Sequence, residues 1–62
     1  MSSRNYLAEI LDLLKQRQMY ITEIARTLKI SRITVDKYVT LLEAKGLVKT
    51  EKIGYLKLCR AI

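Results

Sequence analysis

The chain has 62 residues, the length of one small domain, and we expect a single domain over residues 1–62 with a limited hydrophobic core. Lysine and arginine number 12 against 6 acidic residues, and the net charge of +6 indicates a polyanionic partner such as nucleic acid. One cysteine and no histidine exclude an intrachain disulfide and leave almost no means of building a zinc site.

The sequence does not indicate catalysis, cofactor binding or membrane insertion. The chain has no free carboxylate pair and no glycine-rich loop, so we expect neither an enzyme nor a cofactor. No small-molecule ligand is evident. The N-terminus lacks the apolar run of a signal peptide, and no stretch is long enough to span a membrane. We therefore expect a cytoplasmic, nucleoid-associated protein in which Cys59 is a small buried hydrophobe.

Residues 4–17 are predicted to form a first, amphipathic helix. Four apolar positions recur at helical spacing and define its inner face: Leu7, Ile10, Leu11 and Leu14. The candidates for the N-cap are Ser2, Ser3 and Asn5. Tyr6 and Leu13 form a second apolar stripe beside this face. The stripe is either covered by the C-terminal strand or is the seam of a dimer, because a domain of this size needs additional buried surface.

A short β-leaning link, residues 19–21, precedes the predicted second helix over residues 22–28. Thr22 is the expected N-cap of this helix, with Glu23 placed at the positive end of the helix dipole. Lys29 and Ile30 form the turn that follows.

The third predicted helix covers residues 31–45, with Ser31 as its N-cap and Gly46 as the left-handed residue after its end. A rotation of 100° per residue sorts its side chains into two faces. The inward face consists of Val35, Val39 and Leu42, with Tyr38 at its edge. The opposite face consists of Ile33, Lys37 and Thr40, flanked by Arg32 and Asp36 on one side and by Thr34 and Leu41 on the other.

Residues 47–59 are predicted to form a β-hairpin, because two β-leaning runs flank a turn that contains Gly54. The element order is therefore helix, helix, turn, helix, hairpin. The predicted fold class is α+β, mainly α.

Two groups of residues at this spacing resemble a known family. The first group is ITEIA (21–25) followed by LKIS (28–31), and the second is SRxTVxxYVxxLExxGLV (31–48), where x marks a position outside the match. Both resemble the winged helix-turn-helix domain of small bacterial and archaeal transcription regulators. The resemblance implies three helices followed by a hairpin wing. It further implies a cytosolic protein, usually dimeric, that binds double-stranded DNA as a repressor or activator.

The predicted reading surface is the start of the third helix, since helix-turn-helix domains place the N-terminal residues of this helix against base edges. Arg32 is suited to guanine O6 and N7, and Ile33 to a thymine methyl group. Ser31 and Thr34 offer hydroxyl groups, while Lys37 reaches the phosphate backbone one turn later. The alternative is an ordinary solvated helix face on which Ser31 serves only as a cap.

Further backbone contacts are predicted around this surface, on the second and third helices and on the wing. They are Thr22, Arg26, Lys29, Thr40, Lys49, Lys52 and Lys57. Lysines on edge strands also prevent strand pairing between molecules, which gives the three wing lysines a competing explanation. Among these three, Lys52 at the hairpin tip is the strongest candidate for a DNA contact. Tyr38 is interpreted as a packing residue with a solvated hydroxyl group.

The sequence is compatible with several functions. The first is a sequence-specific regulator acting as a homodimer, with Tyr6, Leu13 and Ile62 as the tentative dimer contacts. The others are a weakly specific chromatin-type DNA-binding protein and a winged-helix protein-interaction module. An RNA-binding domain is less favoured, because no aromatic platform for stacking bases is apparent.

Overall fold

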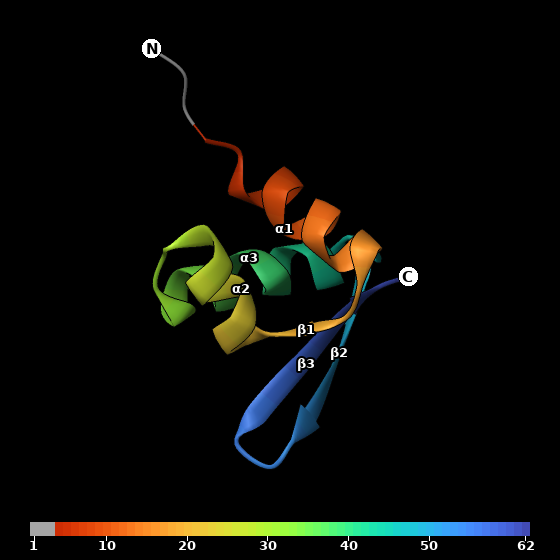
Figure 1. The fold of residues 1–62 in the computed structure, drawn as a ribbon. Helices are drawn as coiled ribbons and strands as arrows, with labels where there is room; N and C mark the ends of the chain where they lie inside the picture. Colours follow the sequence, from red (N-terminus) through yellow and green to blue (C-terminus); the bar gives the residue numbers. More distant parts are fainter. Residues whose placement is uncertain (1–3) are drawn as a thin grey trace.

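The computed structural model describes residues 4–62, which form three helices and a three-stranded antiparallel sheet (Figure 1). In chain order the elements are α1 (Tyr6–Gln16), β1 (Met19–Tyr20), α2 (Ile21–Leu28), α3 (Arg32–Ala44), β2 (Val48–Ile53) and β3 (Leu56–Ala61). The predicted α+β fold, with three helices and a hairpin wing, is therefore confirmed. Among these residues no helix has both the length and the apolar character that a membrane crossing requires.

Helix α1 begins one residue after Asn5, whose side-chain oxygen accepts a hydrogen bond from the Ala8 amide at 3.2 Å. Asn5 is thus the cap, and the other two candidates, Ser2 and Ser3, lie outside the described residues. The helix ends at Gln16 because the backbone of Arg17 is extended. The predicted helix of residues 4–17 was slightly too long at both ends.

The prediction that Thr22 caps the second helix is wrong. Helix α2 begins at Ile21, whose side chain is buried in the core, so Thr22 already lies within the first turn. The extended residue before the helix is Tyr20, and its amide donates to the Glu23 carboxylate at 3.1 Å. A second oxygen of this carboxylate lies 3.5 Å from the Arg17 guanidinium. Glu23 therefore closes the start of α2 and links it to the end of α1.

Helix α3 has the predicted N-cap, Ser31, and is one residue shorter at each end than the predicted residues 31–45. The Ser31 hydroxyl accepts a hydrogen bond from the Thr34 amide at 3.1 Å, which satisfies one free donor of the first turn. At the other end Gly46 has a φ of +75°, and the Leu47 amide donates back to the Leu42 carbonyl. This left-handed glycine reverses the chain directly into β2.

The sheet has the strand order β1-β3-β2. In the central strand β3, Cys59 pairs with Met19 of β1 on one side and with Thr50 of β2 on the other. The short link before α2 is thus a strand, as its composition predicted. The wing is longer than residues 47–59, because β3 continues to Ala61 and pairs there with Val48. The turn end of the hairpin projects away from the helices (Figure 1).

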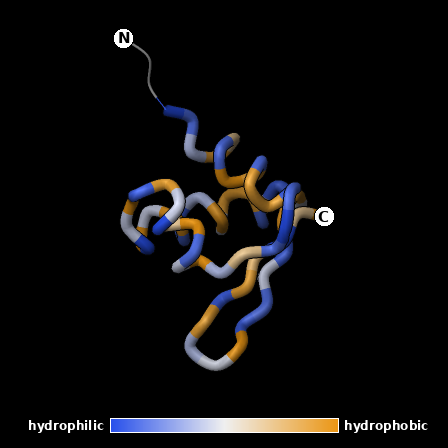
Figure 2. Tube along the Cα trace, in the orientation of Figure 1, coloured by the Kyte–Doolittle hydropathy of each residue, from blue (hydrophilic) through white to orange (hydrophobic). Residues whose placement is uncertain are grey.

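One core joins the three helices to the inner face of the sheet. Its completely buried members come from every layer: Ile10, Ile24, Val35, Val39, Val48 and Cys59. Tyr6 and Leu13 are half-buried against this core, and the Tyr6 ring lies 5.8 Å from that of Tyr38. For Tyr6, α3 rather than the C-terminal strand provides the aromatic partner. Figure 2 shows hydrophobic positions along the helices and continuing along the hairpin towards its turn.

Candidate nucleic-acid interface

The first turn of α3 presents side chains to solvent on a rigid backbone. Ile33 is 84% exposed, which is unusual for a large aliphatic side chain, and Arg32 is exposed beside it. The hydroxyl groups of Ser31 and Thr34 are 2.8 Å apart and hydrogen-bond to each other. Ser31 thus has a structural role as a cap, and one of the two hydroxyl hydrogens is not used within the pair and remains free for an outside acceptor.

The next turn of α3 continues this exposed face. Lys37 and Thr40 are exposed, and the Lys37 ammonium lies 5.8 Å from the centre of the Tyr38 ring. Tyr38 itself is half-buried and packed against the core, so its interpretation as a packing residue is confirmed. Its ring holds the Lys37 side chain near the helix surface through a cation–π contact.

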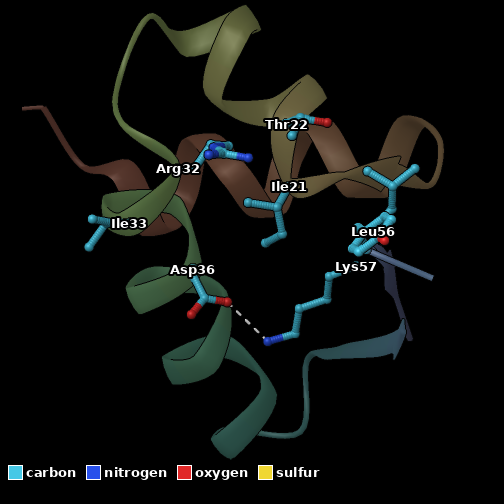
Figure 3. A pocket seen from close by; sticks show the side chains of 8 residues that line it. Ile21, Thr22, Arg32, Ile33, Asp36, Leu56 and Lys57 are labelled. Atoms are coloured by element: carbon cyan, nitrogen blue, oxygen red, sulfur yellow. Dashed lines mark hydrogen bonds and ion pairs between the residues drawn. The ribbon is translucent and has the colours of Figure 1, made fainter. Parts of the chain in front are cut away.

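A cleft of about 330 Å³ separates α3 from the wing (Figure 3). The start of α2 forms a third wall. Eight residues line the cleft: Ile21, Thr22, Arg32, Ile33, Asp36, Tyr55, Leu56 and Lys57. Two predicted reading residues and two predicted backbone contacts therefore border one cleft, together with two further aliphatic side chains, Ile21 and Leu56. The charge of the cleft comes from two cations, Arg32 and Lys57, and one carboxylate, Asp36.

Lys57, predicted as a contact to the DNA backbone, forms an ion pair with Asp36 within the protein. Its ammonium lies 3.0 Å from the Asp36 carboxylate, so the side chain crosses from β3 to α3 (Figure 3). The register explains this direction, because Lys57 lies two residues before the buried Cys59 and so on the same face of the sheet. Sequence reasoning placed Asp36 at the edge of the reading surface but did not identify this ion pair.

The other predicted backbone contacts are distributed over several surfaces. Arg26 and Lys29 are exposed on and directly after α2, and Lys52 is exposed near the wing turn. Lys49 alternates with the buried Val48 and so lies on the outer face of the sheet. Lys49 and Lys57 are consequently on opposite faces, and they do not form one continuous stripe.

Tyr55 is a cleft residue that the sequence reasoning did not select. It is fully exposed in the wing turn, directly after Gly54, whose φ is +60°. The available signal was its position next to a turn glycine, where an aromatic side chain has no core to cover it. Leu56 and Ile53 beside it are also more than 40% exposed, so the wing carries an apolar end.

Cys59 is completely buried between the sheet and the helices, as predicted for a small hydrophobe. Burial raises the pKa of its thiol to about 11. The thiol is therefore neutral and shielded at physiological pH. Within residues 4–62, no three side chains among His, Cys, Asp and Glu are grouped so that they could hold a metal ion.

A sequence profile described as sugar-specific transcriptional regulator TrmB matches residues 8–62, nearly the whole chain. The chain belongs to the TrmB family. Its members are transcription regulators with a winged-helix domain, which agrees with the predicted resemblance. No curated protein sequence matches the chain.

Solved structures similar to this TrmB-family domain include reduced HlyU from Vibrio cholerae N16961, with a TM-score of 0.86 and 21% identity over 94% of the chain. AdcR, the adhesin competence repressor of Streptococcus pyogenes, has a TM-score of 0.86 and 24% identity over 95% of the chain. A mutant of Lactococcus lactis ZitR, solved in complex with DNA, has a TM-score of 0.85 and 25% identity over 98%. The TrmB-family chain spans 61%, 46% and 44% of these three proteins, respectively.

Proposed function

We propose that this TrmB-family domain binds double-stranded DNA by placing the first turn of α3 in the major groove, with the wing against the flanking backbone. The observation that carries the proposal is the exposed Arg32–Ile33 pair on a capped helix start. Arg32 supplies the bidentate donor set that recognises guanine, and Ile33 supplies an apolar contact for a thymine methyl group. Lys37, one turn later, is placed to contact a phosphate.

The wing and the start of α2 complete the proposed interface. Lys52 near the wing turn provides an exposed positive charge, and Thr22 lies at the positive end of α2 on the same cleft as Arg32. Arg26, Lys29 and Thr40 remain proposed backbone contacts on exposed positions. The DNA-bound ZitR structure supports this proposal at the level of the fold, because that protein and this domain share the same arrangement of elements.

A substitution experiment tests the proposal directly. Duplex affinity is measured by fluorescence anisotropy for Arg32→Ala with Lys37→Ala. Lys15→Ala with Lys45→Ala serves as the control, because it removes the same charge at two exposed positions outside the proposed interface. We expect the first pair to weaken binding by at least tenfold, since a good arginine–guanine contact alone is worth about 1–3 kcal/mol. Equal affinities for the two double variants would contradict the proposed interface.

The chromatin-type alternative differs in specificity and not in the surface used. For a regulator, a selected duplex binds more tightly than a random duplex by a factor of about 10³ or more at physiological salt. A much smaller ratio would favour the weakly specific protein. We further propose that the regulator acts in the cytoplasm as a homodimer. The exposed Ile62 and the half-buried Tyr6 and Leu13 are its candidate contacts, and sedimentation of a monomer at high micromolar concentration would contradict them.

A further inference from the structure

Two polar contacts connect the wing strands to α3. Near the base of the wing, the Thr50 hydroxyl donates to the Glu43 carboxylate at 2.9 Å. Farther out, the Lys57 ammonium meets the Asp36 carboxylate at 3.0 Å. Asp36 and Glu43 are about two helical turns apart on α3, so both contacts follow the same side of the helix. Among the hydrogen bonds of residues 4–62, the Lys57–Asp36 contact is the outermost one between the wing and α3.

The apolar side chains in the outer half of the wing are largely exposed. Val48 and Cys59 at the base are buried, whereas Ile53, Tyr55 and Leu56 are between 41% exposed and fully exposed. Beyond Lys57 the two strands pair only with each other. A two-stranded ribbon of this kind is weakly ordered by itself, so its direction relative to α3 depends on contacts near its middle. The ion pair between Lys57 and Asp36 is the charged contact at this position.

Asp36 is a negative charge on a surface that is otherwise suited to phosphate. It lies one turn after Arg32, and both line the cleft (Figure 3). A carboxylate so placed repels a nearby phosphate unless a cation neutralises it. Lys57 performs this neutralisation, and its half-buried side chain is directed into the cleft and not along the strand into solvent.

We propose that Asp36 and Lys57 are positioning residues that set the direction of the wing relative to α3, so that both elements reach one duplex together. This positioning role rests on the proposed function, because it requires α3 and the wing to contact the same duplex. The ion pair fixes the wing before DNA arrives, which reduces the ordering that binding itself must impose. Lys57 acts on DNA through Asp36, and not as an independent phosphate ligand.

The sign of one substitution separates the two roles of Lys57. If Lys57 is a phosphate ligand, Asp36 competes with DNA for it, and Asp36→Asn tightens binding by removing a repulsive charge. If the pair positions the wing, Asp36→Asn weakens binding although it makes the protein more positive. We expect a two- to fivefold loss, on the order of what an exposed ion pair contributes.

The experiment measures duplex affinity for Asp36→Asn, Lys57→Met and the double variant at several salt concentrations. Asp12→Asn and Lys15→Met make the same charge changes on the exposed side of α1 and serve as matched controls. We expect the double variant to bind no more weakly than Lys57→Met alone, since the shared contact is lost only once. We also expect Lys57→Met to change the salt dependence no more than Lys15→Met does, whereas loss of a phosphate ligand lowers the slope by about 0.9.

Wing order gives a readout that does not depend on DNA. In Asp36→Asn, we expect lower amide order parameters at Lys52 and Gly54 by nitrogen-15 relaxation. Order parameters equal to those of the wild type, or affinity equal to or tighter than that of Asp12→Asn, would overturn the positioning role.

The failure of this inference is distinguishable from failure of the proposed function. Arg32→Ala is measured on the same duplex. If Arg32→Ala weakens binding and Asp36→Asn tightens it, the interface stands and only the positioning role is overturned. If Arg32→Ala leaves the affinity unchanged, the proposed interface is overturned, and the positioning role falls with it.

Discussion

Ser31 is the residue at which stability and DNA binding should respond in opposite directions. Its hydroxyl accepts the Thr34 amide at 3.1 Å and so caps the helix that we propose enters the major groove. Ser31→Ala removes the acceptor and should cost about 1 kcal/mol of unfolding free energy. A domain of this size has a total stability of about 3–9 kcal/mol, so this change is a substantial fraction. The corresponding fall in melting temperature is about 4–8 °C.

Ser31→Asp keeps an acceptor at the cap and adds a negative charge at the positive end of α3. We expect stability equal to or higher than that of the wild type by up to about 1 kcal/mol, since a negative charge at a helix N-terminus is favourable. The same charge faces the proposed phosphate surface, so duplex affinity should fall. Ser31→Ala should therefore lose stability more than affinity, and Ser31→Asp should lose affinity alone.

Urea denaturation followed by far-UV circular dichroism gives the stabilities, and fluorescence anisotropy gives the affinities. Asn5→Asp is the matched control, because Asn5 caps α1 through the same kind of contact and lies outside the proposed interface. It adds one negative charge at an equivalent cap. If Ser31→Asp binds the duplex as tightly as Asn5→Asp does, the first turn of α3 does not face DNA and the reasoning is refuted.

Three further predictions concern stability. Lys29 has a left-handed φ of 58° at the end of α2, a conformation that glycine adopts without strain, so Lys29→Gly should raise the melting temperature. Lys45, at the end of α3, has an ordinary φ of −83°, so Lys45→Gly should lower it. A lower melting temperature for both variants would contradict the strain at Lys29. Ile10→Ala removes a completely buried side chain and should lower the free energy of unfolding in urea denaturation by about 2–5 kcal/mol. A loss below about 1 kcal/mol would show that the site is not close-packed. Because burial raises the pKa of the Cys59 thiol from 9.0 to about 11, the folded state binds more protons in this range, and its stability should decline from pH 9 to pH 11. Cys59→Ala should make that decline shallower, and an equal pH dependence for both proteins would place the thiol in solvent.

The elements whose signals are local were predictable from the sequence. Ser31 and Gly46 mark the two ends of α3, and each acts through its own backbone neighbours. The hairpin turn at Gly54 is of the same kind. The inward positions of α3 follow from helical geometry alone, and Val35, Val39 and Leu42 are indeed buried.

The start of α2 was not predictable from the cap preference alone. Thr22 is a suitable N-cap by residue type, but the core draws Ile21 into the helix and moves its start one residue earlier. Glu23 then closes the helix through the Tyr20 amide. Burial, which depends on the whole fold, overruled a local preference that contributes only about 1 kcal/mol.

The Lys57–Asp36 contact depends on tertiary structure. The two residues are 21 positions apart, and they meet only because the hairpin register places Lys57 on the same face as Cys59. A shift of one residue in that register would direct Lys57 outwards with Lys49. The α3 side chain that Lys57 meets on this face depends on how the sheet packs against the helix, so the sequence pattern alone could not distinguish a free lysine from a paired one.

Selection of bound duplexes from a random pool, carried out in parallel for the wild-type protein and Arg32→Ala, is the most direct test of the proposed DNA contact. The wild type should select a defined sequence that contains a guanine, and Arg32→Ala should lose its preference at that position, by about 1–3 kcal/mol, while keeping the rest of the sequence. Recovery of the same sequence with both proteins would contradict the placement of the α3 first turn in the major groove.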